Sequence, residues 1–150
     1  MSDLLENMKA PYFTSDRDGG SLIDTSLLNS PYIIYFYPKD DTPGCTKEAC
    51  NFRDDFSKYK KQGVTIFGMS GDSIEKHKKF SEKYSLPFIL LSDPEKSTIK
   101  KYGAFGEKKF MGRSFQGIKR MTYVIKKGII KHVFEKVKVK EHSDEILRLI

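Results

Sequence analysis

The order of strands and helices along the chain predicts an α/β fold, with helices on both faces of a central mixed β-sheet. Three buried, β-rich runs alternate with helical patterns, so the crossover helices make these strands parallel. Two more strands then follow across a short turn and add antiparallel strands. We expect a single domain over residues 1–150, a length that suits one hydrophobic core.

The first expected elements are a short hairpin and a buried strand. Strands are expected at Tyr12–Ser15 and Ser21–Asp24, around the Asp-Gly-Gly turn of residues 18–20, because glycine adopts positive φ easily. The apolar run Tyr32–Tyr37 is typical of a strand buried on both faces. Pro38 ends it, since proline cannot donate to a central ladder.

Helices and strands alternate through the middle of the chain. After a polar loop, apolar side chains recur every three or four residues from Cys45 to Lys61, as on one face of a helix. The elements expected next are the strand Val64–Ser70, the helix Ile74–Tyr84, the strand Phe88–Leu91 and the helix Pro94–Tyr102.

The end of the chain predicts a hairpin and a closing helix. Residues 105–117 are expected to form a loop. Met121–Ile125 and Ile129–Phe134 are two strands across a Lys127-Gly128 turn, and Ser143–Ile150 is a short helix. This layout matches a thioredoxin-like fold with an N-terminal β-hairpin.

Composition excludes several functional classes. Apolar residues make up 38%, aromatic residues 13% and charged residues 31% of the chain, which argues against a disordered or fibrous protein. No apolar run approaches the roughly 18–20 residues of a membrane helix. The first residues also lack a signal-peptide pattern, so we expect a cytoplasmic protein.

The net charge of +7 is concentrated in the second half of the chain. Residues 1–75 carry 8 Lys/Arg and 12 Asp/Glu, and residues 76–150 carry 19 and 8. Clustered cations attract nucleic acid or acidic proteins. Most lysines occur as short pairs in amphipathic patterns, so a solvated surface is the first interpretation and a nucleic-acid-binding module an alternative. The alternation from Lys136 to Lys140 favours an edge strand guarded by charge.

The two clustered cysteines are the strongest functional signal. Cys45 follows a buried strand and begins a helix, where α/β sheets place their sites. A helix N-terminus stabilises a thiolate, the nucleophilic form of cysteine. Thr42 could donate a hydrogen bond to the sulfur or to a bound oxygen, and Pro38 and Pro43 would stiffen the loop. A small buried hydrophobe is the alternative for each cysteine, more so for Cys50.

The spacing of the two cysteines restricts a disulfide between them. In an intact helix, residues five apart are separated by about 7.5 Å along the axis and point roughly 140° apart. A disulfide needs Cα atoms within about 4.4–6.8 Å. A Cys45–Cys50 bond therefore requires the first turns of the helix to unwind.

The cysteine segment resembles the active-site signature of the peroxiredoxins. Residues 38–45 read Pro-x-x-x-Thr-x-x-Cys, and the longer block 35–54 resembles the peroxiredoxin Q (bacterioferritin comigratory protein) branch. A separate block, Gly117-Ile118-x-Arg120, follows in the order of that family. The turn after the expected strand Met121–Ile125, Lys126-Lys127-Gly128, departs from the family's Asp-led one, and this departure concerns substrate shape and surface partners and not the chemistry.

The resemblance implies a thiol peroxidase that acts on hydrogen peroxide and organic hydroperoxides without metal or other cofactor. Cys45 would be the peroxidatic cysteine and become a sulfenic acid, and Cys50 would be the resolving cysteine that forms an intramolecular disulfide with it. Arg120 would stabilise the thiolate and polarise the peroxide. Thr42 would orient the peroxide, and Pro38 would cover the sulfur.

The resemblance also implies partners. Thioredoxin or a similar dithiol protein would reduce the disulfide by exchange. The charge of the basic second half, independently of the resemblance, suggests that it helps to dock an acidic reductant. A monomer is favoured, with a dimer left open. Glu48 would support the site. A thiol–disulfide oxidoreductase on the same fold is the alternative enzyme, against which the absence of a CxxC motif counts.

The remaining polar groups are expected to be structural. His77, His132 and His142 are scattered, with no metal-ligand spacing near an acid cluster, and are expected at or near the surface. The adjacent carboxyl groups of Asp40 and Asp41 are expected to be solvated, because neighbouring residues in a loop rarely converge.

Overall fold

A computed structural model describes residues 4–150. The elements in chain order are β1 (Thr14–Arg17), β2 (Ile23–Asp24), a 3₁₀ helix (Thr25–Leu27), β3 (Tyr32–Phe36), α1 (Pro43–Asp54), α2 (Phe56–Lys61), β4 (Thr65–Ser70), α3 (Ile74–Tyr84), β5 (Ile89–Ser92), α4 (Ser97–Lys101), β6 (Phe105–Phe110), β7 (Arg113–Ile118), β8 (Met121–Lys126), β9 (Ile129–Phe134) and α5 (His142–Leu147).

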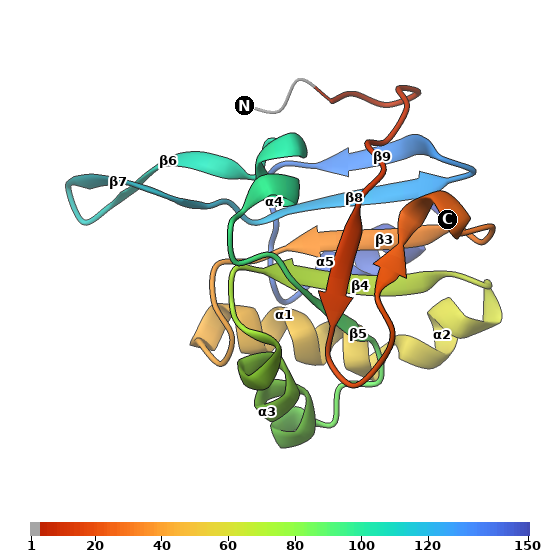
Figure 1. The fold of residues 1–150 in the computed structure, drawn as a ribbon, viewed down its shortest axis with the longest axis horizontal. Coiled ribbons are helices and arrows are strands. Elements are labelled where there is room, and N and C mark those ends of the chain that lie inside the picture. The colour runs from red at the N-terminus through yellow and green to blue at the C-terminus, as the bar shows by residue number, and fades with distance from the viewer. Residues whose placement is uncertain (1–3) are drawn as a thin grey trace.

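A mixed sheet of seven strands organises the molecule, in the order β2-β1-β5-β4-β3-β8-β9 (Figure 1). Strands β3, β4 and β5 run parallel, β8 pairs antiparallel with β3, and β9 pairs antiparallel with β8. The N-terminal hairpin extends the sheet, because β1 pairs with both β2 and β5. The predicted mixed sheet and N-terminal β-hairpin are therefore confirmed.

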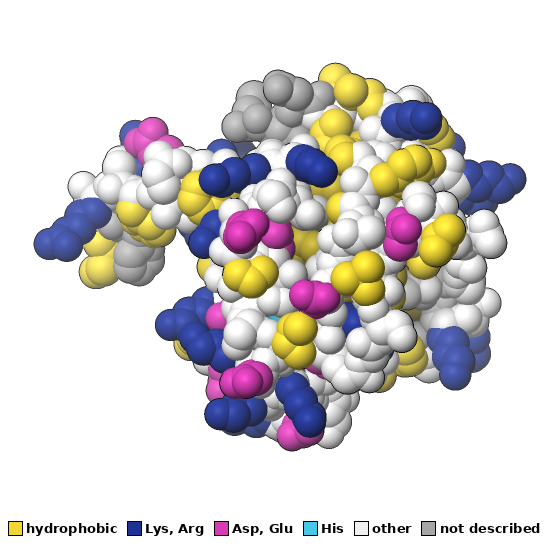
Figure 2. All heavy atoms as spheres, viewed as in Figure 1, with side chains coloured by type: hydrophobic (Ala, Val, Ile, Leu, Met, Phe, Trp, Pro, Cys, Tyr) yellow, Lys and Arg dark blue, Asp and Glu magenta, His cyan; other side chains and the backbone are white. Residues whose placement is uncertain are grey.

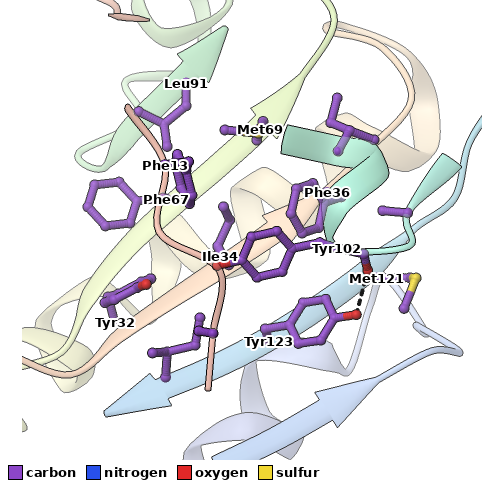
Figure 3. Packing of buried hydrophobic residues seen from close by; sticks show 14 of the residues in the cluster. Phe13, Tyr32, Ile34, Phe36, Phe67, Met69, Leu91, Tyr102, Met121 and Tyr123 are labelled. Carbon is purple, nitrogen blue, oxygen red and sulfur yellow. Dashed lines mark hydrogen bonds between the residues drawn. The ribbon is translucent and has the colours of Figure 1, made fainter. Parts of the chain in front are cut away.

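Side chains of β3 alternate between the two faces of the sheet and build a core on each. Tyr32, Ile34 and Phe36 point to the face covered by α4 and the N-terminal segment, where Phe36 packs with Tyr102 and Tyr123 (Figure 3). The residues between them point to the opposite face, under α1, α2, α3 and α5. Each large side chain buried in this way stabilises the fold by about 1.5–3 kcal/mol, so β3 anchors the loop that follows it.

The helix expected from Cys45 to Lys61 is in fact two helices. The first, α1, begins earlier, at Pro43, because proline suits the first helical position, where no N–H donor is needed. The chain then breaks at Asp55, whose carboxylate accepts a hydrogen bond from Ser143 Oγ of α5 at 2.8 Å. The earlier start places Cys45 inside the first turn of α1.

Residues 105–117, expected to be a loop, instead form a hairpin. Strands β6 and β7 pair with each other and turn at Met111 and Gly112, both at positive φ. This hairpin, the β6–β7 arm, projects from the body of the molecule (Figures 1 and 2). Most β7 side chains are exposed. Because the arm is largely exposed to solvent and packs no face on the core, its sequence lacks the apolar alternation that predicts strands.

The alternating lysines between Lys136 and Lys140 do not form the expected edge strand. They lie in a bend, an irregular stretch and a turn that connect β9 to α5, and no strand in the described part of the chain pairs with them. Among residues 4–150, no helix has the length and apolar character needed to cross a bilayer.

Candidate active site

Cys45 lies just beyond the carboxyl end of β3, in the first turn of α1. Pro43 is the first residue of this helix, and Thr42 precedes it as the N-cap residue. The N–H groups of a first helical turn lack partners within the helix and favour negative charge nearby. The Cys45 side chain is 1% exposed and belongs to the aromatic core under α1. The predicted position of this thiol at a helix start is confirmed.

The Arg120 guanidinium reaches Cys45 from the residue before β8. Its Nη2 lies 3.4 Å from the Cys45 sulfur, and its Nη1 donates to Glu48 Oε1 at 2.7 Å. Gly44 permits this approach, since a Cβ there would lie 3.2 Å from Nη2. Burial opposes the charge on Arg120, but Glu48 and Cys45 outweigh it and raise the Arg120 pKa. A full positive charge therefore faces the sulfur.

Glu48 contacts Arg120 from the buried side of α1. Its side chain is fully buried, and among the described residues its Oε2 has no hydrogen-bond partner. Burial raises the pKa of Glu48 to about 7, although Arg120 lowers it. Near neutral pH, Glu48 therefore exchanges a proton beside the Arg120–Cys45 contact. When Glu48 is protonated, the guanidinium charge acts mainly on the sulfur.

We expect the Glu48→Gln variant to lose the part of the pH dependence of the free energy of unfolding that Glu48 causes. The Glu48 carboxyl has a pKa of 4.5 as a free group and about 7 in the fold, so the folded protein binds more protons between these values. The free energy of unfolding of the wild type therefore falls as pH rises through this range, by roughly 3 kcal/mol for such a shift. Chemical denaturation at a series of pH values measures the free energy of unfolding. If this free energy changes with pH equally in wild type and Glu48→Gln, the prediction is contradicted.

Cys50 lies on the same helix as Cys45 and is half-buried. Both cysteines are free thiols, and α1 runs without a break through both positions. The geometry of an intact helix thus applies, in which side chains five residues apart diverge by roughly 140°. The first turns of α1 must therefore unwind before a disulfide can form between the two cysteines, and this stays a prediction.

Thr42 and Pro38 belong to the loop between β3 and α1. Thr42 Oγ1 donates to the carbonyl oxygen of Lys39 at 3.0 Å, so its proton is directed into the loop and not to the Cys45 sulfur as expected. The hydroxyl oxygen can still accept a hydrogen bond from a bound peroxide. Pro38 is half-buried, two residues after the end of β3. The roles of both residues toward a peroxide stay predictions.

The structure corrects the expectation for Asp40 and for two histidines. Asp40, expected to be solvated, is 9% exposed and lies 2.7 Å from His77 Nδ1 through its Oδ2, whereas Asp41 is exposed as expected. His77 and His142 are buried, and only His132 lies near the surface. A carboxylate and an imidazole can leave water when they satisfy each other's hydrogen bonds. Sequence does not reveal such a pair across 37 residues.

Three potential metal-ligand atoms, from Asp40, Asp72 and His77, lie within 4.8 Å of one another. The group holds a single histidine, whereas the expectation from sequence concerned pairs of histidines at metal-ligand spacing. Each carboxylate already has partners, since Asp72 Oδ2 accepts from the Asp40 N–H at 2.9 Å and from Ser70 Oγ at 2.7 Å. We therefore describe the group as a hydrogen-bonded polar cluster and assign no ion to it.

The fold places the chain among the thioredoxin-like proteins, and its site holds a buried cysteine at the start of a helix. The family model described as AhpC/TSA family matches residues 7–133. The chain belongs to this family, the peroxiredoxins, which are peroxidases.

Within the family, the chain is similar to the Bcp or peroxiredoxin Q branch. A putative peroxiredoxin Bcp of Coxiella burnetii is 46% identical over 141 residues, 93% of each chain. The peroxiredoxin Bcp of Escherichia coli K12 is 42% identical over 140 residues, 92% of this chain and 90% of the relative. A crystal structure of Xylella fastidiosa PrxQ matches with a TM-score of 0.92 at 27% identity, over 99% of this chain and 96% of the other. The predicted family resemblance and thioredoxin-like fold are confirmed.

Proposed function

We propose that the chain is a thiol-specific peroxidase that reduces hydrogen peroxide and organic hydroperoxides at Cys45. The contact of 3.4 Å between Arg120 Nη2 and the Cys45 sulfur, at the start of α1, carries the proposal. The guanidinium and the helix N-terminus both favour the thiolate and the charge that develops on the leaving oxygen.

A structural relative supports organic hydroperoxides as substrates. The bacterioferritin comigratory protein of Xanthomonas campestris, whose structure was described for its alkyl peroxide reduction activity, matches with a TM-score of 0.86 at 32% identity. The match covers 91% of this chain and 88% of the other.

The reaction proceeds in two covalent steps on this chain. The Cys45 thiolate attacks the terminal oxygen of the peroxide, the O–O bond breaks, and the leaving oxygen takes a proton and departs as water or an alcohol. Cys45 is thereby oxidised to a sulfenic acid. The Cys50 thiol then attacks this sulfur, a disulfide forms, and the sulfenic oxygen leaves as water. Unwinding the first turns of α1 brings the two sulfur atoms together for this step.

A dithiol protein such as thioredoxin regenerates the enzyme. Its thiolate attacks the Cys45–Cys50 disulfide, passes through a mixed disulfide and leaves oxidised, while both cysteines of this chain return to thiols. The excess of Lys and Arg in the second half of the chain favours an acidic reductant. Both cysteines lie in one chain, so a monomer suffices, and a reducing compartment such as the cytoplasm suits the cycle.

The experiment is peroxide consumption coupled to NADPH oxidation through thioredoxin and thioredoxin reductase. We expect one NADPH oxidised for each peroxide consumed, with both hydrogen peroxide and an organic hydroperoxide. Raising the salt concentration should slow reduction by thioredoxin, because salt screens exposed charges, and should leave the reaction with a neutral peroxide unchanged.

Separate outcomes would contradict separate parts of this proposal. If the rate at which thioredoxin reduces the disulfide does not change with salt, only the charge-guided docking is contradicted. Absence of consumption with several peroxides and several dithiol donors contradicts the peroxidase itself. Reduction of insulin disulfides would then support a thiol–disulfide oxidoreductase, and salt-sensitive DNA or RNA binding that Cys45→Ser leaves unchanged would support a nucleic-acid-binding module.

A further inference from the structure

A buried ion pair between Asp40 and His77 lies beneath the loop that leads to Cys45. His77, on α3, is fully buried, and both of its ring nitrogens contact oxygen acceptors. Its Nε2 lies 2.9 Å from the Leu91 carbonyl oxygen, and its Nδ1 lies 2.7 Å from Asp40 Oδ2. A carbonyl oxygen can only accept and a carboxylate only accepts, so both nitrogens donate. With Asp40 as a carboxylate, His77 is then an imidazolium paired with it.

Further hydrogen bonds fix Asp40 from several sides. Its Oδ1 accepts a hydrogen bond from the Tyr37 hydroxyl at 2.5 Å, and its backbone N–H donates to Asp72 Oδ2 at 2.9 Å. Asp72 is itself held by the Ser70 hydroxyl at 2.7 Å. The loop residue Asp40 is thus joined to the ends of β3 and β4 and, through His77, to α3 and β5.

The far end of the cysteine segment has an anchor of its own. Asn51 Oδ1 accepts from the backbone N–H of Ser143 at 3.0 Å, and Asp55 accepts from the Ser143 hydroxyl at 2.8 Å. Between Asp40 and Asn51, two sets of side-chain hydrogen bonds reach other parts of the described fold. The exposed Asp41 contacts Lys83 and Tyr84. Arg120 contacts Cys45 and Glu48. The residues that would unwind for a Cys45–Cys50 bond therefore lie between two fixed points.

We propose that His77 is a positioning residue for the reaction at Cys45: by holding Asp40, it fixes the point at which the unwinding segment begins and keeps the Thr42–Cys45 turn in its reactive geometry. This inference rests on the proposed peroxidase function. His77 does not contact the sulfur, and it acts through the loop.

The charge of His77 makes this anchor sensitive to alkaline pH. The groups that face the imidazole are Asp40 from the loop, Tyr37 after β3 and Asp72 from the turn before α3. The other charged residues that line the cavity beside Asp40 and Asp72 are Lys39, Asp41, Lys76, Lys79 and Lys83. Burial lowers the pKa of His77, but the hydrogen bond and charge of Asp40 outweigh it and raise this pKa above its usual value. The ion pair is therefore lost as pH rises through this raised pKa.

The test compares wild type with His77→Gln in the single-turnover reaction of Cys45 with hydrogen peroxide. We expect the rate constant of the variant at neutral pH to be about 10- to 100-fold lower, the range for misplacement of a reacting group. The ratio of wild-type to variant rate constants should fall toward one at alkaline pH, where wild-type His77 loses its charge. Packing loss alone would give a ratio that does not change with pH.

Hydrogen exchange measures the anchor independently of peroxidase activity. In His77→Gln we expect faster exchange at the Asp40 amide, which donates to Asp72, and at the Thr46 amide, which donates to the Thr42 carbonyl. The matched control is His132→Gln, which changes a half-buried histidine outside this cluster and should leave both readouts at wild-type values. If His77→Gln fails to fold, Asp40→Asn, which has the same shape, takes the same measurements.

Two results would overturn the proposal. One is a rate ratio that stays constant across pH, including a ratio near one. The other is unchanged exchange at residues 40 and 46 in a folded variant. Failure of the proposed function gives a different result, because the wild type would not react with peroxide at all while the exchange difference would persist.

Discussion

Cys45→Ser abolishes peroxide consumption, whereas Cys50→Ser reduces one equivalent of peroxide and then stops. A serine hydroxyl does not ionise at neutral pH and cannot form a sulfenic acid, so turnover at position 45 falls by roughly 10⁴-fold or more, as for loss of a nucleophile elsewhere. Cys50 is half-buried further along α1 and takes no part in attack on the peroxide, so the first turnover in Cys50→Ser keeps the wild-type rate constant. The cycle then stops at the Cys45 sulfenic acid.

Mass spectrometry and circular dichroism separate these states. With peroxide, Cys50→Ser gains one oxygen atom as a sulfenic acid, whose sulfur dimedone then alkylates with loss of water, while wild type loses two hydrogen atoms as the disulfide forms. Wild type also loses helical signal on oxidation, since α1 must unwind, and Cys50→Ser does not. Thr46→Ser is the matched control, because it places serine in the same turn without removing a thiol. Turnover by Cys45→Ser, or sustained turnover by Cys50→Ser, contradicts the two-cysteine cycle.

Local patterns explain which parts of this site could be predicted from sequence. The apolar run of β3, the Pro-Gly loop and the helical spacing after it are contiguous, so they placed Cys45 at a strand end and a helix start. The contact of Arg120 with Cys45 joins residues 75 positions apart, and no local pattern connects them. Only the family resemblance indicated Arg120 as part of the site.

The features that sequence missed depend on tertiary partners. A buried Asp40 needs His77 and Tyr37 beside it, and each of these residues alone is more often a surface or core group. One signal was available, since His77 and Phe80 lie three residues apart on α3 and both are buried. The β6–β7 arm was missed for the opposite reason, because its strands do not border the core and so carry no apolar alternation.

Arg120→Met lowers the rate constant for peroxide reduction by about 10²- to 10³-fold, as loss of one donor to a developing anion does elsewhere. Arg120→Lys recovers only part of this rate, because one ammonium cannot reach Glu48 and Cys45 with the two-pronged geometry of a guanidinium. The methionine variant should still fold. Burial already raises the pKa of Glu48 to about 7, and without the lowering effect of Arg120 this carboxyl stays protonated, so no buried charge is stranded.

The pH dependence of Cys45 alkylation shows whether Arg120 acts on the thiolate. A guanidinium beside a sulfur favours the thiolate over the thiol, so alkylation of Arg120→Met should have its midpoint at higher pH than alkylation of the wild type. Arg113→Met, at the exposed tip of the β6–β7 arm, removes the same charge away from the sulfur and should leave midpoint and rate unchanged. If the rate falls while the midpoint stays, Arg120 acts on the peroxide alone. If neither changes, the contact between Arg120 and Cys45 does not contribute to the reaction, and the observation that carries the proposed function is lost.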